Sequence, residues 1–221
     1  MKNFISTMKR SMLDRLHFLK IRELSLPYEA VEEFEGLYER FIATGSGHAF
    51  TYTGQYPVWQ FLHYMIENKH IVVHGSNSST IDEFIPREST LFTGSPVKSV
   101  FAATDGIWSL FFAVRKKEGY EGSIRNLCLT VPGKKGIMRY YYFSVNEEMG
   151  ECWTDGTIYF LSRDSFRQGG IRDEWVSDKP VRPLAKMAVT PADFPFLNEV
   201  RRHRETDPAW KTILKAMFLK H

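Results

Sequence analysis

From residue 71 onward the chain alternates short apolar runs with turns, and this pattern restricts the fold more than any other feature of the sequence. β-Branched and aromatic residues dominate the runs, as is typical of β-strands. The runs are IVV (71–73), SVFAA (99–103), NLCLTV (126–131), MRYYYFSV (138–145), TIYFLS (157–162) and LAKMAVT (184–190). The sequence therefore predicts a strand-rich domain in this part of the chain.

Helices are predicted mainly before this region. Residues 28–43 and 58–67 have apolar side chains spaced by three and four, which is the period of an amphipathic helix, and Pro57 suits a first turn. One more helix is predicted at residues 105–115, directly after the SVFAA run, with Thr104 or Asp105 as its N-cap. The apolar residues within 192–221 predict a docked terminal helix.

Strands and helices are segregated along the chain, which favours an α+β fold over a doubly wound sheet. We expect residues 1–68 to form an N-terminal helical cap region and residues 69–221 to form the α+β domain. One continuous domain is the alternative, because 221 residues can share a single core.

Composition excludes several classes of protein. Lys and Arg total 29 against 26 Asp and Glu, an excess too small to indicate a nucleic-acid or membrane surface. No apolar run approaches eighteen residues, so no membrane span is expected. Cys128 and Cys152 lack the spacing of a disulfide framework or a metal site, which suits a cytoplasmic location.

Basic residues beside the MRYYYF run raise a nucleic-acid alternative. Lys134, Lys135 and Arg139 lie close to three consecutive tyrosines, and aromatic and basic side chains together can bind single strands. Alternation in a sheet would bury some of these tyrosines, so packing is the preferred interpretation.

Three places in the sequence could carry chemistry. His74, Gly75 and Ser76 follow the IVV run directly, at the predicted end of a strand. Phe101 lies in the SVFAA run that leads into the predicted helix at residues 105–115. Glu174 is followed by Trp175 in the charged stretch RDEWVSDKP.

The order and spacing of these motifs resemble the ADP-ribosyltransferase superfamily over roughly residues 72–189. In that family a first strand ends in His-Gly-Ser or His-Gly-Thr, an aromatic strand runs into a helix, and a later strand begins with a catalytic glutamate. The family usually has tyrosine where Phe101 stands. The resemblance implies an ADP-ribosyltransferase-like split sheet.

The resemblance also implies a reaction, namely cleavage of NAD at its nicotinamide glycosidic bond and transfer of ADP-ribose to an unknown acceptor. His74 is expected to donate a hydrogen bond to a ribose hydroxyl, with Gly75 approaching the carboxamide and Ser76 supporting the ribose. Phe101 would stack on the nicotinamide ring. Glu174 would stabilise the oxocarbenium-like charge on the ribose.

Two other functions remain open on the same fold. One is a non-catalytic module that binds a nucleotide or a protein. The other is an enzyme similar to the RNA 2′-phosphotransferases, which rely on histidines and arginines that we cannot place beyond His74 and the region of Arg87. The sequence motifs of common hydrolases, nucleotide triphosphatases, zinc proteases and Rossmann enzymes do not occur.

Overall fold

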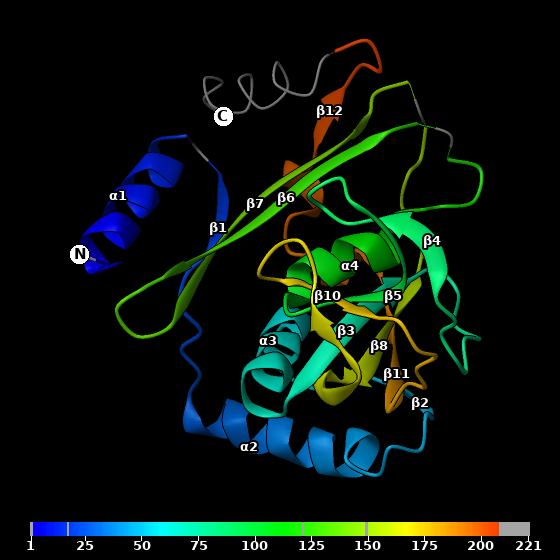
Figure 1. The fold of residues 1–221 in the computed structure, drawn as a ribbon. Coiled ribbons are helices and arrows are strands. Elements are labelled where there is room, and N and C mark those ends of the chain that lie inside the picture. Colours follow the sequence, from blue (N-terminus) through cyan, green and yellow to red (C-terminus); the bar gives the residue numbers. More distant parts are fainter. Residues whose placement is uncertain (1, 17, 121, 149, 208–221) are drawn as a thin grey trace. The chain divides into compact units, whose positions relative to one another are not determined.

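The computed structural model describes residues 2–16, 18–120, 122–148 and 150–207, and the chain divides into two compact units (Figure 1). Unit 1 consists of Met1–Leu24, Glu118–Cys152 and Phe196–His221, and unit 2 of Ser25–Lys117 and Trp153–Pro195. The mixture of helices and sheets confirms the α+β class.

Unit 2 is built around a large, strongly twisted sheet, as Figure 1 shows. Its described strands run in the order β2-β11-β8-β3-β5-β10-β9, and β4 pairs with β5. Their bounds are β2 Ala49–Thr51, β3 Ile71–Ser76, β4 Arg87–Thr90, β5 Pro96–Ala103, β8 Gly156–Ser162, β9 Arg167–Gln168, β10 Glu174–Ser177 and β11 Ala185–Val189. The apolar runs predicted as strands within this unit are therefore confirmed.

The helices of unit 2 also lie close to their predicted positions. They are α2 Tyr28–Leu37, continued by a π-helical turn at Tyr38–Ile42, then α3 Val58–Asn68 and α4 Gly106–Val114. Short 3-10 turns follow at Arg163–Ser165 and Pro191–Asp193. Asp105, one of the two predicted N-caps, caps α4, because its Oδ1 accepts a hydrogen bond from the Trp108 amide at 2.8 Å.

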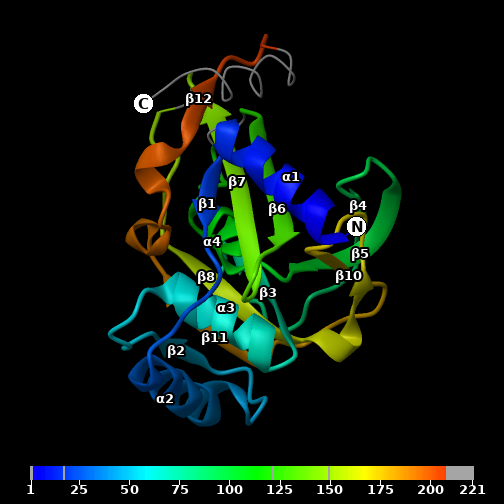
Figure 2. The same ribbon diagram turned by 90° about the vertical axis from the view of Figure 1, so that its left-hand side faces the viewer.

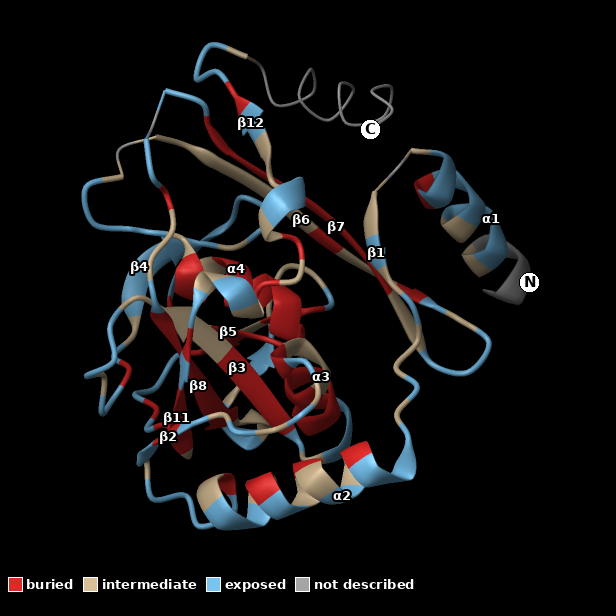
Figure 3. Cartoon of the chain, turned by 180° about the vertical axis from the view of Figure 1, so that it is seen from behind, coloured by how far each residue is buried: buried red, intermediate tan, exposed pale blue. Residues whose placement is uncertain are grey.

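Residues on the two sides of this sheet have different surroundings. We call the side that carries Val73 and Phe160 the helix face, because Phe61 of α3 packs on Phe160. We call the other side the loop face; there Phe84, from the segment after β3, contacts the ring of Tyr159. Within unit 2, Figure 3 shows the buried residues concentrated in β3, β8, α3 and α4.

In the part of unit 1 that the structure describes, helix α1 lies on a smaller sheet (Figure 2). Its long hairpin, β6 Ile124–Pro132 and β7 Ile137–Asn146, is joined by β1 Leu19–Ile21 and by β12 Arg201–His203, which follows a 3-10 turn at Leu197–Glu199. Helix α1, Lys2–Arg15, packs through Leu13 on Val131 and Tyr140. The three consecutive tyrosines of β7 are buried, which confirms that they serve packing.

Two expectations differ from the structure. The predicted terminal helix at 192–221 is not helical over 192–207, where short 3-10 turns lead into β12, and 208–221 lie outside the described residues. The expected boundary between residues 68 and 69 does not separate the two units, because β2 pairs with β11 and therefore belongs to the main sheet. No helix among the described residues is long and apolar enough to span a bilayer.

Candidate functional site

The main sheet splits beside His74. Strand β3 pairs with β8 along all of Ile71–Ser76. On its other side β3 pairs with β5 at one position, Val73 with Ala103. The two strands therefore part after Val73, and the His74 ring bridges the split, with Nδ1 2.7 Å from the carbonyl oxygen of Phe101.

This contact determines the protonation of His74. A carbonyl oxygen can only accept, so Nδ1 carries the hydrogen and donates it to Phe101. Burial lowers the pKa of His74 below its usual value and favours the neutral ring. In a neutral ring with Nδ1 protonated, Nε2 is an acceptor, and it makes no hydrogen bond with the described residues. Toward a ligand, this tautomer of His74 would accept a hydrogen bond, whereas the resemblance implies that His74 donates one.

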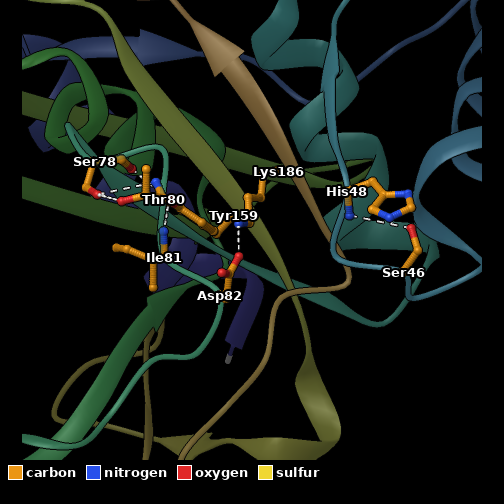
Figure 4. A network of polar contacts seen from close by, with 8 residues as sticks. All are labelled: Ser46, His48, Ser78, Thr80, Ile81, Asp82, Tyr159 and Lys186. Atoms are coloured by element: carbon orange, nitrogen blue, oxygen red, sulfur yellow. Dashed lines mark hydrogen bonds and ion pairs between the residues drawn. The ribbon is translucent and has the colours of Figure 1, made fainter.

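On the loop face, aromatic rings lie beside His74, and hydrogen bonds attach the segment after β3 to Tyr159. The ring of Phe84 lies 4.7 Å from that of His74, and that of Tyr159 lies 6.5 Å away. The Tyr159 hydroxyl donates to the carbonyl of Ser78 at 2.7 Å and accepts from the amide of Ile81 at 3.2 Å (Figure 4). The segment after β3 is therefore fastened over the loop face beside His74.

A second contact in this network lies on the neighbouring strand. Lys186 of β11 pairs with Asp82 at 2.5 Å, and this ammonium lowers the pKa of the Asp82 carboxyl (Figure 4). Lys186 lies opposite Tyr159 in the sheet, so its side chain belongs to the loop face as well. The pair attaches the segment after β3 at a second point.

Gly75 serves close packing of a helix. A Cβ built on Gly75 would lie 2.0 Å from the carbonyl oxygen of Ser109, so only glycine lets α4 approach β3 here. Gly156 of β8 has the same relation to the carbonyl oxygen of Ala113, again at 2.0 Å. Ser76 lies one residue beyond, and its Oγ accepts from the Ser78 amide at 3.2 Å.

Glu174 lies on the helix face, at the start of β10. It pairs with Ala103, while Phe101 pairs with Val176 two positions along, so Glu174 and Phe101 are diagonal neighbours on one face. The Glu174 side chain is 5% exposed. Phe101 is partly buried on the same face.

Both carboxylate oxygens of Glu174 have partners. Oε1 accepts from the amide of Phe92 at 2.9 Å, and Oε2 accepts from the amide of Gly170 at 2.6 Å. A Cβ on Gly169 would lie 2.7 Å from Oε2, so this glycine lets the turn pass close to the carboxylate. Glu174 thus ties the β4–β5 loop to the turn before β10.

The structure brings the predicted residues together only in pairs. His74 reaches Phe101 through the carbonyl oxygen, and Phe101 shares the helix face with Glu174. Val73 and Glu174 both pair with Ala103, so His74, the neighbour of Val73, projects to the opposite face from Glu174. The three side chains do not converge on one face of the sheet.

Two aromatic residues near the split were not predicted as site residues. Tyr159 lies directly opposite His74, and the alternation in TIYFLS could have placed it on one face with Leu161. Trp175 lies on the same loop face, where its Nε1 donates to Thr104 Oγ1 at 3.2 Å. The guanidinium of Arg163 lies 4.1 Å from the centre of the Trp175 ring, a contact that no local pattern predicts.

Comparison of the chain with protein-family models, with curated proteins and with solved structures finds no match. Among the described residues, no group of three or more histidine, cysteine or acidic side chains could hold a metal ion. Function therefore has to be argued from the geometry of the site.

Proposed function

We propose that unit 2 binds NAD at the split between β3 and β5, and that the protein is an ADP-ribosyltransferase-like enzyme. The observation that carries the proposal is the His-Gly-Ser sequence at the split, with His74 presenting an acceptor nitrogen beside it. A ribose hydroxyl of NAD is a donor of the kind that Nε2 requires.

The proposed reaction breaks the bond between the ribose C1′ and the nicotinamide nitrogen. Nicotinamide leaves with the bonding electrons, the ribose becomes oxocarbenium-like, and the acceptor attacks C1′ and loses a proton. A carboxylate facing the ribose stabilises this charge. Glu174 is the candidate, since it lies on the same face as Phe101, on a strand that pairs with β5. Because His74 projects to the opposite face, NAD would have to cross the sheet at the split between β3 and β5 for its ribose to meet both side chains.

Glu174 has acceptor capacity beyond its two backbone contacts. An ionised carboxylate offers about four lone-pair sites, of which the Phe92 and Gly170 amides use two. A ribose hydroxyl could use a third if the β4–β5 loop admits it. Catalysis by Glu174 therefore requires that this loop make room for the ribose.

One observation favours a second function, that of a non-catalytic module that binds a nucleotide on the same fold. Glu174 is nearly buried and holds two loops together through backbone amides. That is also how a purely structural carboxylate is used. In this case NAD or a related nucleotide would bind at His74 and remain intact.

Release of nicotinamide from NAD separates the two functions. We expect release by the unaltered protein and a decrease of about two orders of magnitude or more in Glu174→Gln, the scale of losing one electrostatic stabiliser. Asp178→Asn is the control, because Asp178 is an exposed carboxylate paired with Arg167 and lies outside the split.

The outcomes are distinct. NAD binding without nicotinamide release from the unaltered protein would support the binding module. Absence of both binding and release would contradict both functions. Equal release by the unaltered protein and Glu174→Gln would exclude Glu174 from the reaction.

A further inference from the structure

Charge is divided unevenly between the two units. Unit 1 contains 16 Lys and Arg against 10 Asp and Glu, a net charge of +6, whereas unit 2 contains 13 against 16, a net charge of −3. The whole chain has only a small excess of positive charge, but unit 1 by itself is basic. Positive charge concentrated in one unit is the electrostatic footprint expected for a polyanionic partner.

A cavity of about 500 Å³ lies in this basic unit, between α1 and the start of β7. Its size suits a nucleotide-sized group. Five of its lining residues come from α1 and one from β7, namely Thr7, Arg10, Ser11, Asp14, Arg15 and Met138.

Asp14, the one carboxylate among the lining residues, already has a cationic partner. Asp14 pairs with Lys20, Oδ1 to Nζ at 2.6 Å, and accepts from the Tyr140 hydroxyl at 3.4 Å. Arg10 and Arg15 make no ion pair with any of the described residues, and Arg10 donates a hydrogen bond to Thr7 Oγ1 at 3.1 Å. The cavity therefore presents two uncompensated guanidinium groups together with hydroxyl donors.

We propose that this cavity holds a backbone phosphate of a nucleic-acid strand. Guanidinium groups match phosphate oxygens in charge and geometry, and Ser and Thr hydroxyls supplement them at phosphate contacts. A strand fits better than a single nucleotide, because the net charge of +6 counted for the sequence of unit 1 exceeds what one phosphate would neutralise. The proposal is independent of the NAD site, since none of these residues belongs to unit 2.

The test is binding of a labelled, single-stranded 12-nucleotide RNA to the full chain, measured by fluorescence anisotropy from 50 to 200 mM salt. Arg10→Gln with Arg15→Gln removes two charges from the cavity. Arg172→Gln with Arg182→Gln removes the same charge from exposed positions in unit 2. Thermal melting of all three proteins checks that each remains folded.

We expect the cavity variant to bind at least about tenfold more weakly at 50 mM salt, with a plot of log K against log salt shallower by about 0.7, the contribution of one single-strand phosphate. The control should stay within about twofold of the unaltered protein. Failure of the unaltered protein to bind the RNA, or equal losses in the two variants, would overturn the proposal. So would competition by adenosine monophosphate or inorganic phosphate as effective as that by the RNA at equal phosphate concentration.

Discussion

At the scale of single residues, His74 makes a structural contact and, in the proposed function, also a contact with the ligand. Its Nδ1–H satisfies the Phe101 carbonyl where β3 and β5 part, and its Nε2 remains an acceptor. Substitutions can separate these two contributions, because the side-chain amide nitrogen of asparagine lies about where Nδ1 lies in histidine. Asparagine has no counterpart of Nε2.

We expect His74→Ala to lower the free energy of unfolding by about 1–3 kcal/mol, because it leaves the Phe101 carbonyl without its donor. His74→Asn should lower the free energy of unfolding by less than His74→Ala does, since the asparagine amide can still donate to that carbonyl. Urea denaturation of the three proteins measures both effects. Equal losses in the two variants would show that the bond to Phe101 contributes little to stability.

His203 predicts how stability depends on pH. It is 2% exposed and lies between Ser144 at 2.7 Å from Nδ1 and Ser123 at 2.9 Å from Nε2. Burial, followed by the charge of Arg125, lowers its pKa in the folded state. The unfolded chain therefore binds more protons below the ordinary histidine pKa of about 6.5, and stability falls as the pH drops through this range.

The unfolding free energy should thus decrease between pH 7.5 and pH 5, by about 1.4 kcal/mol for each pKa unit of depression. Because the pKa of His74 is lowered too, both histidines contribute in the same direction. His203→Asn should show a smaller decrease over this interval in urea denaturation. An identical decrease in the variant would mean that His203 is not responsible.

Sequence reasoning located His74 but could not foresee the surroundings of Glu174. A histidine directly after three β-branched residues is a local signal of a strand, although β3 does not end at His74 as predicted but continues to Ser76. The partners of Glu174 are backbone amides of Phe92 and Gly170, and every residue except proline offers such a donor. No residue pattern marks that arrangement, so Glu174 could be recognised only as an acid before a tryptophan.

At the scale of elements, the spacing of apolar residues predicted the helices and strands in which that spacing is clear. Runs such as TIYFLS and the three central helical segments are long or apolar enough for the period to decide. The helix prediction was wrong over residues 192–207, because β12 is three residues long and forms by pairing with β7, some 57 residues earlier in the chain. Such distant pairing leaves no trace in the spacing of apolar residues.

The packing of α4 on the sheet predicts the cost of adding a methyl group to Gly75. Gly75→Ala would place its Cβ 2.0 Å from the Ser109 carbonyl oxygen, and this backbone atom cannot move without shifting α4. We expect a loss of at least about 1–3 kcal/mol in the free energy of unfolding, as for overpacked cores. Gly36→Ala is the matched control, because a Cβ there meets nothing within 4 Å and lies in α2.

Alanine is the better helix former by about 1 kcal/mol, so the control should be neutral or stabilising. Chemical denaturation of both variants provides the comparison. If Gly75→Ala were as stable as Gly36→Ala, α4 could not pack on β3 as closely as the structure shows.

At the scale of the whole molecule, the two units are assembled from segments far apart in the sequence. Residues 118–152 form the hairpin of unit 1 but interrupt unit 2. Within unit 2, the ends of this interruption lie side by side, because Arg115 pairs with Trp153 and the Thr154 amide donates to the Val114 carbonyl at 2.9 Å. No low-complexity linker marks these boundaries, so a linear search for linkers could not reveal the division.

This arrangement predicts that unit 2 folds alone. A chain of residues 25–195 in which a short glycine-rich linker replaces 118–152 should melt cooperatively and keep the secondary structure of unit 2. Circular dichroism during heating measures this. A non-cooperative transition would show that unit 2 depends on unit 1 for its stability.

The central claim is that NAD binds at the split beside His74, and the most direct measurement is the melting temperature at increasing NAD concentration. Binding to the folded state alone adds about 2.7 kcal/mol at a ligand concentration one hundred times Kd, so the melting temperature should rise continuously with NAD. In His74→Asn, which retains a donor for Phe101 but lacks the Nε2 acceptor, the rise should be lost or strongly reduced. A melting temperature that does not respond to NAD, or that rises equally in both proteins, would contradict the account.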